Sequence, residues 1–320
     1  MELNNIMKKI LTRERVKELG LDKLEVITSD MLNGYTSIGR DAFYGCSSLK
    51  SITIPDSITS IGENAFAYCH YLTSIILPIS ITSIGSGAFF ECCALISITI
   101  PNFVKNIGDK TFCRCSSLIS ITIPNSVKCI GYHAFCDCSS LTSITIPNSV
   151  NRIMDYAFDN CTSLSSIIIP NSIKSIGNFV FLNCSSLTSI TIPNSITKIG
   201  WCAFFNCNKL KSIIIGDKTY KIQKVFDGVC KAYKAFKTGM ICHDFQYEEG
   251  KTYEIKGKIR LCERGFHACL NLLDVFNYYN GKFGKDIVVH EVELEKVSNE
   301  MHNEDSKVVA KKITIGKRLL

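Results

Sequence analysis

The chain has 320 residues, 46% of them hydrophobic, and a formal net charge of +7. This length accommodates two domains of ordinary size with buried cores. Because phosphate binding depends on dense local positive charge and no segment clusters Lys and Arg, nucleic acid is excluded as an expected partner.

Residues 1–30 are predicted to form a helical N-terminal cap. Thr12 is suited to the N-cap of a helix over RERVKEL, and Gly20 is suited to its C-terminal end. The segment lacks the apolar core of a secretory signal, and the chain has no run of 18 apolar residues that would predict a membrane-spanning helix. We therefore expect a cytoplasmic protein without membrane insertion.

Residues 31–216 repeat one phrase with a period of 23 residues. The same spacing separates all seven prolines, Pro55, Pro78, Pro101, Pro124, Pro147, Pro170 and Pro193. It also separates a phenylalanine column (Phe43, Phe66, Phe89, Phe112, Phe135, Phe158, Phe181, Phe204) and a cysteine column (Cys46, Cys69, Cys92, Cys115, Cys138, Cys161, Cys184, Cys207). A fixed period of this length is typical of a solenoid.

Each unit is predicted to make one circuit of a coil. LxSIxI alternates as a strand does, with Ile52 and Ile54 on one face and Ser51 and Thr53 on the other. Proline ends that strand because it has no N–H to donate to a ladder. SITSIG predicts a second short strand, and AFxxC a helical turn that places Phe and Cys under the strands.

The unit resembles the BspA type of leucine-rich repeat, whose hallmark is IPxSVxxIGxxAFxxCxxLxSIxIP. The resemblance covers about residues 31–216 in about eight units. It implies a right-handed leucine-rich repeat solenoid with a parallel sheet on one face, used in that family mainly for binding or adhesion. One departure is Met154, which stands where the other units carry glycine.

The cysteines of the column are interpreted as buried free thiols. Stacked equivalents lie about 4.8 Å apart, which a disulfide would tolerate, but a reducing compartment favours their use as small apolar side chains. Five cysteines lie outside the column and are interpreted as incidental, namely Cys93, Cys113, Cys129, Cys136 and Cys202. Two of them, Cys113 and Cys136, are stacked equivalents.

The period stops after Gly216. Residues 217–228 are predicted to be a linker or a C-terminal cap, and residues 229–320 a small α+β domain with one helix near LLDVFNYY. The phrases FQYEEGKTYE, LCERGFHAC, LDVFNYY and KVVAKKITIG resemble an uncharacterised module of phage and large DNA virus proteins, and this resemblance implies no activity. Together with the richness in Ile, Asn and Lys, it suggests a viral source, with the host cytoplasm or the virion as location.

The C-terminal segment offers weak candidates for metal ligation, which are Cys242, His243, Cys262, His267 and Cys269. Their spacing matches no common zinc module, so a structural role is the preferred interpretation. A catalytic group can be imagined from Glu263, Arg264, His267, His290 and Glu291, but no nucleophile, phosphate-loop or paired-carboxylate motif supports it. We therefore predict no enzymatic activity, no cofactor and no metal.

The repeats indicate which surface binds a partner. The outward positions of the main strand are Ser and Thr or Ile in every unit, which gives a flat, nearly uncharged surface without the aromatic or Arg anchors that dominate interface energy. Variation is concentrated after the repeat glycine and after the phenylalanine. We therefore expect a protein partner to contact Tyr132, Tyr156 and Trp201.

The sequence favours a non-enzymatic protein-interaction or adhesion-type scaffold, which in the viral interpretation acts on a host protein. Two alternatives stay open. In the first, residues 229–320 are an enzymatic or metal-binding effector that the repeats deliver to a target. In the second, the monotony of the serine positions reflects a structural component of a particle or surface.

Overall fold

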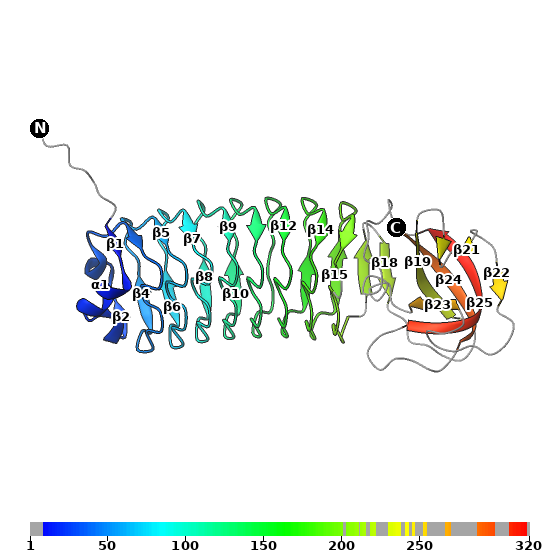
Figure 1. Cartoon of the computed structure of the whole chain (residues 1–320), viewed down its shortest axis with the longest axis horizontal. Helices are drawn as coiled ribbons and strands as arrows, with labels where there is room; N and C mark the ends of the chain where they lie inside the picture. Colours follow the sequence, from blue (N-terminus) through cyan, green and yellow to red (C-terminus); the bar gives the residue numbers. More distant parts are fainter. Residues whose placement is uncertain are drawn as a thin grey trace, which may run out of the picture.

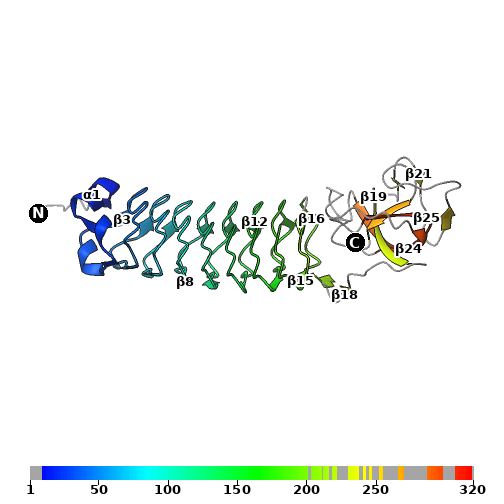
Figure 2. The ribbon, with the colours of Figure 1, turned by 90° about the horizontal axis from the view of Figure 1, so that it is seen from below.

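The computed structural model describes residues 9–200, 203–210, 212–215, 218–221, 230–237, 241–242, 245–246, 252–254, 266–269, 287–297 and 307–318, with side chains up to residue 210. The repeats stack into a solenoid in which each unit forms one coil (Figure 1). Figure 2 shows two sheets on different sides of the solenoid, with β8 and β15 along one side and β3, β12 and β16 along the other. The predicted repeat solenoid is confirmed.

The N-terminal segment contains β1 (Ile10–Leu11), α1 (Arg13–Glu18), the 3-10 helix η1 (Leu21–Lys23), β2 (Val26–Ile27) and the 3-10 helix η2 (Ser29–Leu32). The side chain of Thr12 accepts a hydrogen bond from the backbone N–H of Arg15, and Gly20 adopts a left-handed φ of 67° after the helix. Both predicted helix ends are therefore confirmed. The segment is also a first coil, because β1 and β2 pair in parallel with β3 and β4.

The main sheet is formed by the LxSIxI segments. Its strands are β4 (Ser51–Thr53), β6 (Ser74–Ile76), β8 (Ser97–Thr99), β10 (Ser120–Thr122), β13 (Ser166–Ile168), β15 (Ser189–Ile192) and β17 (Ser212–Ile215). Equivalent residues pair in parallel, such as Ser51 with Ser74. Ile52 and Ile54 are buried while Ser51 and Thr53 are partly exposed, which confirms the predicted alternation.

The second sheet is formed by the residues before the repeat glycine. Its strands are β3 (Ser37–Ile38), β5 (Ser60–Ile61), β7 (Ser83–Ile84), β9 (Asn106–Ile107), β11 (Cys129–Ile130), β12 (Arg152–Ile153), β14 (Ser175–Ile176) and β16 (Lys198–Ile199). They pair in parallel and in register from β3 to β7 and from β9 to β16. The serine that follows the proline joins adjacent coils, since the Ser126 hydroxyl donates to the Val104 carbonyl at 2.6 Å.

The AFxxC segment forms tight turns where the sequence predicted a helical turn. Two positions in each turn adopt a left-handed φ, such as His133 (53°) and Asp137 (59°), and this interrupts a right-handed helix. Between them, backbone N–H groups donate to the next coil, as Phe43 does to the Ala65 carbonyl at 2.7 Å. Adjacent turns are thus hydrogen-bonded along the solenoid as the strands are.

The interior is a set of stacked identical side chains. The phenylalanine rings from Phe43 to Phe204 stack with centroids 5.1 to 5.6 Å apart and planes within 9°. From Cys69 onward, each column cysteine donates its thiol to a phenylalanine carbonyl 26 residues earlier, at 3.1 to 3.2 Å. These cysteines are free, and all but half-buried Cys207 are buried, in line with the sequence interpretation.

The repeat glycine is needed for close approach between coils. A Cβ on Gly131 would lie 2.7 Å from the Asp109 nitrogen and the Gly108 carbonyl carbon, which is shorter than real Cβ contacts. The approach is looser at two positions, since a Cβ would meet backbone only at 3.2 Å on Gly108 and at 3.0 Å or beyond on Gly177, beside Met154. In the coil of Met154 residues 143–145 form no strand, and β12 pairs with β14 through Ile153 and Ile176 only. Met154 is therefore accommodated by weaker pairing around it.

After the last coil, β18 (Lys218–Lys221) pairs antiparallel with β17. The described part of the C-terminal segment is an antiparallel sheet of β19 (Cys230–Lys237), β20 (Ile241–Cys242), β21 (Phe245–Gln246), β22 (Thr252–Glu254), β23 (Phe266–Cys269), β24 (Ile287–Val297) and β25 (Lys307–Arg318). The helix predicted near LLDVFNYY lies outside the described residues. Among the described residues, no helix combines the length and apolarity that a membrane crossing requires.

Candidate functional site

The variable positions of the repeats lie together on one side of the solenoid. We call this side the turn edge and define it as the segments between the repeat glycine (Met154 in one unit) and the column cysteine, which are residues 40–45, 63–68, 86–91, 109–114, 132–137, 155–160 and 178–183. Each segment contains the buried Phe and the two left-handed residues of its turn. Residues other than Gly, Asn and Asp rarely adopt this conformation, at a cost of roughly 1–2 kcal/mol each, and seven of the thirteen non-glycine residues with positive φ are of these other types.

The first left-handed position forms an aromatic ladder in three consecutive units. The ring of Tyr156 stacks between those of His133 and Phe179, with centroid distances of 4.7 and 4.6 Å. Burial, followed by the charge of Lys110, lowers the pKa of His133 below its ordinary value. The ladder thus presents a flat, partly buried aromatic surface on the turn edge.

The predicted contact residues belong to this region. Tyr132 is 44% exposed beside the ladder, and its backbone N–H donates to the Asp109 carboxylate at 2.9 Å. Tyr156 is the half-buried middle ring of the ladder. Trp201 lies outside the described residues. The structure therefore brings Tyr132 and Tyr156 to one surface, as neighbours in adjacent units.

The second left-handed position carries a polar ladder. Arg114 pairs with Glu91 at 2.6 Å and, through Nε, with Asp137 at 3.6 Å. The Asn160 amide then donates to the second oxygen of Asp137 at 2.5 Å. Further along, Asn206 donates to Asn183 at 2.9 Å. Each side chain is thus held by its equivalent in a neighbouring coil.

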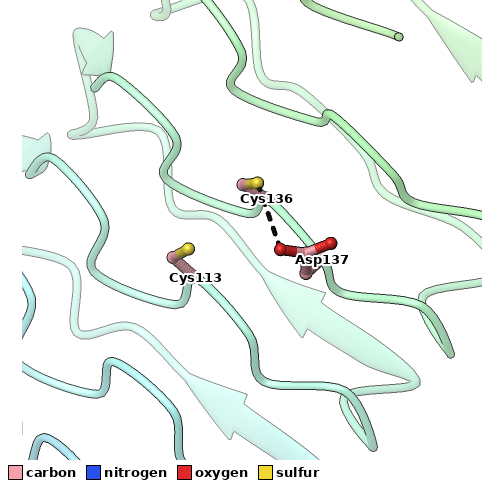
Figure 3. Close-up of side chains that lie close together, drawn as sticks. All are labelled: Cys113, Cys136 and Asp137. Carbon is pink, nitrogen blue, oxygen red and sulfur yellow. Dashed lines mark hydrogen bonds between the residues drawn. The ribbon is translucent and has the colours of Figure 1, made fainter. Parts of the chain in front are cut away.

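The position after the repeat phenylalanine contributes a compact group of side chains. Cys113 and Cys136 occupy this position in adjacent coils and are buried, with 6% and 7% of their surface exposed. Their Sγ atoms and a carboxylate oxygen of Asp137 all lie within 4.8 Å of one another (Figure 3). Asp159 follows Cys136 in the same column, and its Oδ2 lies 3.8 Å from the Cys136 Sγ.

The electrostatics of this group follow from burial and mutual contact. A hydrogen bond between the two thiols lowers the pKa of Cys113, and the same bond, together with burial, raises the pKa of Cys136. Burial and the neighbouring charge of Asp137 raise the pKa of Asp159 to about 6. The Oδ1 atom of Asp159 is buried without a hydrogen-bond partner.

The C-terminal metal candidates are only partly covered by the described residues. His243 and Cys262 lie outside them, and for Cys242, His267 and Cys269 the backbone alone is described. Cys242 ends β20 and Cys269 ends β23, on opposite sides of β19. Cys269 pairs with Tyr233 of β19, and the register of β20 places Cys242 opposite Phe236. Two strand spacings and three residues therefore separate the cysteines, roughly 10 Å across and 10 Å along. The backbone does not bring these cysteines together.

Sequence reasoning missed the group around Cys136. The sequence shows Cys113 and Cys136 as stacked equivalents, but the spacing of ligands within one unit does not reveal the acids beside them. Aligning the units by their 23-residue period would have placed Asp159 in the same column and Asp137 beside it. The left-handed turns were also missed, since no glycine marks most of these positions.

Two families match the chain. The BspA type leucine rich repeat region matches residues 36–130 and 105–232 in six copies, and Domain of unknown function (DUF7666) matches residues 230–320. The two matches together reach from residue 36 to the end of the chain.

Similar solved structures are leucine-rich repeat proteins. One from Bacteroides ovatus ATCC 8483 is 33% identical over 57% of this chain, with a TM-score of 0.44, and the match spans only 59% of that protein. The leucine-rich repeat protein of T. pallidum is 28% identical over 59% of this chain and 78% of its own, with a TM-score of 0.41. A leucine-rich cell surface protein of Faecalibacterium prausnitzii A2-165 has the same identity and coverage, with a TM-score of 0.35. None of the curated proteins matches the chain.

Proposed function

The chain belongs to the BspA type of leucine-rich repeat proteins through residues 36–232, and from this premise we propose that it is a non-enzymatic scaffold that binds a protein partner through its turn edge. The binding surface is centred on Tyr132 and on the aromatic ladder of His133, Tyr156 and Phe179. Exposed aromatic side chains on a rigid backbone bury large areas at little cost in conformational entropy, and they are enriched among the residues that dominate interface energy.

The observation that carries this proposal is the identity of the left-handed residues. Glycine would occupy these positions without steric cost, yet only Gly45 and Gly87 do so in the described units. Thirteen other residues with positive φ retain a side chain there, including Tyr68, Arg114 and Tyr156. Backbone strain retained at the surface is typical of functional sites, so these side chains support binding as the role of the turn edge.

The main sheet offers the contrasting surface. Its outward positions are serine followed by threonine or isoleucine, and the exposed Ile76 and Ile168 stand four units apart. Isolated exposed apolar side chains are normal on a protein surface. Among the described residues, the outward positions of the main-sheet strands form no aromatic group like that of the turn edge, although the exposed Ile96 and Ile119 are neighbours just before β8 and β10.

The test is a comparison of two surface variants of the full chain. Tyr132→Ala with Tyr156→Ala removes the proposed contacts, and Ile168→Thr on the main sheet is the matched control, because other units carry threonine at that position. Partners captured by the wild-type protein are identified by mass spectrometry, and their affinities are measured with purified components. We expect the double variant to lose at least tenfold in affinity and the control to match wild type. Equal affinity for all three proteins contradicts the proposal.

A viral source, a host protein as the partner and a location in the host cytoplasm or the virion are further proposals. They are supported by the sequence resemblance of the C-terminal segment and by the richness of the chain in Ile, Asn and Lys. An enzymatic or metal-binding role for residues 229–320 is tested with the full chain by replacing His267 and measuring partner binding, which the scaffold proposal expects to stay unchanged.

A further inference from the structure

The column after the repeat phenylalanine changes its chemistry in three consecutive units. Elsewhere this position is apolar or aromatic, with Tyr44, Ala67, Phe90, Leu182 and Phe205. In the three units between Phe90 and Leu182 it holds Cys113, Cys136 and Asp159, and Asp137 lies beside it on the turn edge. Each unit is built on the same backbone, so the chain itself shows that packing does not require these residue types.

Two distances from the Cys136 Sγ match those between ligands of a tetrahedral zinc ion. Zn–S bonds of about 2.3 Å and Zn–O bonds of about 2.0 Å place sulfur and oxygen ligands about 3.5 Å apart, and two sulfur ligands about 3.8 Å apart. The Cys136 Sγ lies 3.6 Å from Asp137 Oδ2 and 3.8 Å from Asp159 Oδ2. Cys113 lies within 4.8 Å of both Cys136 and Asp137.

We propose that Cys113, Cys136 and Asp137 bind a zinc ion, with solvent in the fourth position and Asp159 as a second carboxylate beside Cys136. Thiolate and carboxylate together favour zinc over Mg²⁺ or Ca²⁺, which prefer oxygen ligands only. Binding displaces one proton from each thiol to solvent, and each sulfur then donates an electron pair to the ion. The ion joins two consecutive coils through their side chains.

The surroundings of the group support a cation. The Oδ1 atom of Asp159 is buried without a partner, which costs free energy that a bound cation would offset. The Asn160 amide donates to Asp137 Oδ1 at 2.5 Å, while Asp137 Oδ2 accepts from the Cys136 thiol at 3.6 Å. In metal sites, hydrogen bonds of this kind to the second oxygen orient a ligating carboxylate. Arg114, whose Nε lies 3.6 Å from Asp137 Oδ2, offsets part of the negative charge that two thiolates and the carboxylates would bring.

A disulfide between Cys113 and Cys136 is the competing use of the same residues. Stacked coils allow the required separation of about 4.4–6.8 Å between Cα atoms. A disulfide has no use for the two carboxylates, however, and would leave the buried oxygen of Asp159 unpartnered. The acids at Asp137 and Asp159 therefore favour a metal site.

The experiment uses the full-length reduced protein after treatment with a chelator. Zn²⁺ is titrated against a chromophoric indicator, and Co²⁺ is added separately as a spectroscopic probe of thiolate ligation. We expect one equivalent of Zn²⁺ bound per chain and a thiolate-to-cobalt charge-transfer band that Zn²⁺ abolishes. Cys136→Ala should remove the band and weaken Zn²⁺ binding at least 100-fold. Asp159→Asn should weaken binding about 10-fold.

Matched variants control for loss of folding and for zinc binding by cysteines outside the group. Cys136→Ala introduces the residue that the equivalent position carries at Ala67, so folding is expected to survive and is checked by circular dichroism. Cys93→Ala and Cys129→Ala remove thiols outside the group and should leave Zn²⁺ affinity unchanged, as should the triple replacement of Cys242, Cys262 and Cys269 by alanine. The proposal is overturned if the reduced protein takes up no Zn²⁺, or if the cobalt band persists in a folded Cys113→Ala, Cys136→Ala double variant. A Cys113–Cys136 disulfide that forms while the reduced protein takes up no Zn²⁺ assigns the pair to redox chemistry instead.

Discussion

The interior of the solenoid and its turn edge differ in how they use the same period. Phe135 and Tyr132 lie in one unit, three residues apart, yet Phe135 is fully buried in a stack of identical rings and Tyr132 is 44% exposed. Every unit repeats the phenylalanine, and the residue at the position of Tyr132 differs between every two adjacent units. Repetition therefore specifies the coil, while the departures from repetition carry the chemistry that distinguishes this chain.

The largest expected difference between the two regions is in stability. Phe135→Ala leaves a cavity between Phe112 and Phe158 and should lower the free energy of unfolding by about 3–5 kcal/mol. Tyr132→Ala, in the same unit but on the turn edge, should change it by no more than about 0.5 kcal/mol. Urea denaturation of the two variants measures both values. Similar losses for both would show that the turn edge contributes to the core.

The second comparison concerns the repeat glycine. Gly131→Ala forces a Cβ against the backbone of the preceding turn and should cost about 1–3 kcal/mol. Met154→Gly occupies the equivalent position in the one unit that already accommodates a side chain, so it should cost no more than the roughly 0.5–1 kcal/mol of added backbone entropy.

Thermal unfolding of both variants and of the wild type shows which of the two substitutions destabilises the protein more. Equal destabilisation by the two substitutions would mean that the coils around Met154 are as closely spaced as the others.

The smallest expected effect is a pH dependence within the aromatic ladder. Burial and Lys110 lower the pKa of His133, so the folded state binds its proton less tightly than the unfolded state. The associated stability is present above the ordinary histidine pKa of about 6.5 and is lost as the pH falls below it. His133→Tyr, which places the residue of the next unit in the ladder, should remove this loss.

Denaturation midpoints of wild type and His133→Tyr are compared between pH 7.5 and 5.5. The difference between the two proteins should grow as the pH falls, because all other titrating groups are shared. If the stabilities of the two proteins depend on pH in the same way, folding does not lower the pKa of His133.

The regular features of the fold could be predicted because one stretch of sequence decides each of them. The alternation of Ser51, Ile52, Thr53 and Ile54 predicts a strand with one buried face, and Thr12 and Gly20 predict the ends of the first helix. The turn conformation could not be predicted in this way. A left-handed φ at residues such as Glu91 or Arg114 opposes local preference and is imposed by hydrogen bonding to the neighbouring coils.

By itself, the sequence determined the period, the two strands of each coil, the buried columns and the surface on which variation gathers, because these follow from the order of apolar residues and prolines along 23 positions. Only the tertiary structure decided which variable residues meet. Cys113, Cys136 and Asp159 are separated by 23 residues each in the chain, and stacking brings their side chains to within a few ångströms. The physical reason is that hydrogen bonding between parallel coils fixes neighbouring backbones about 4.8 Å apart, whatever side chains the turns carry.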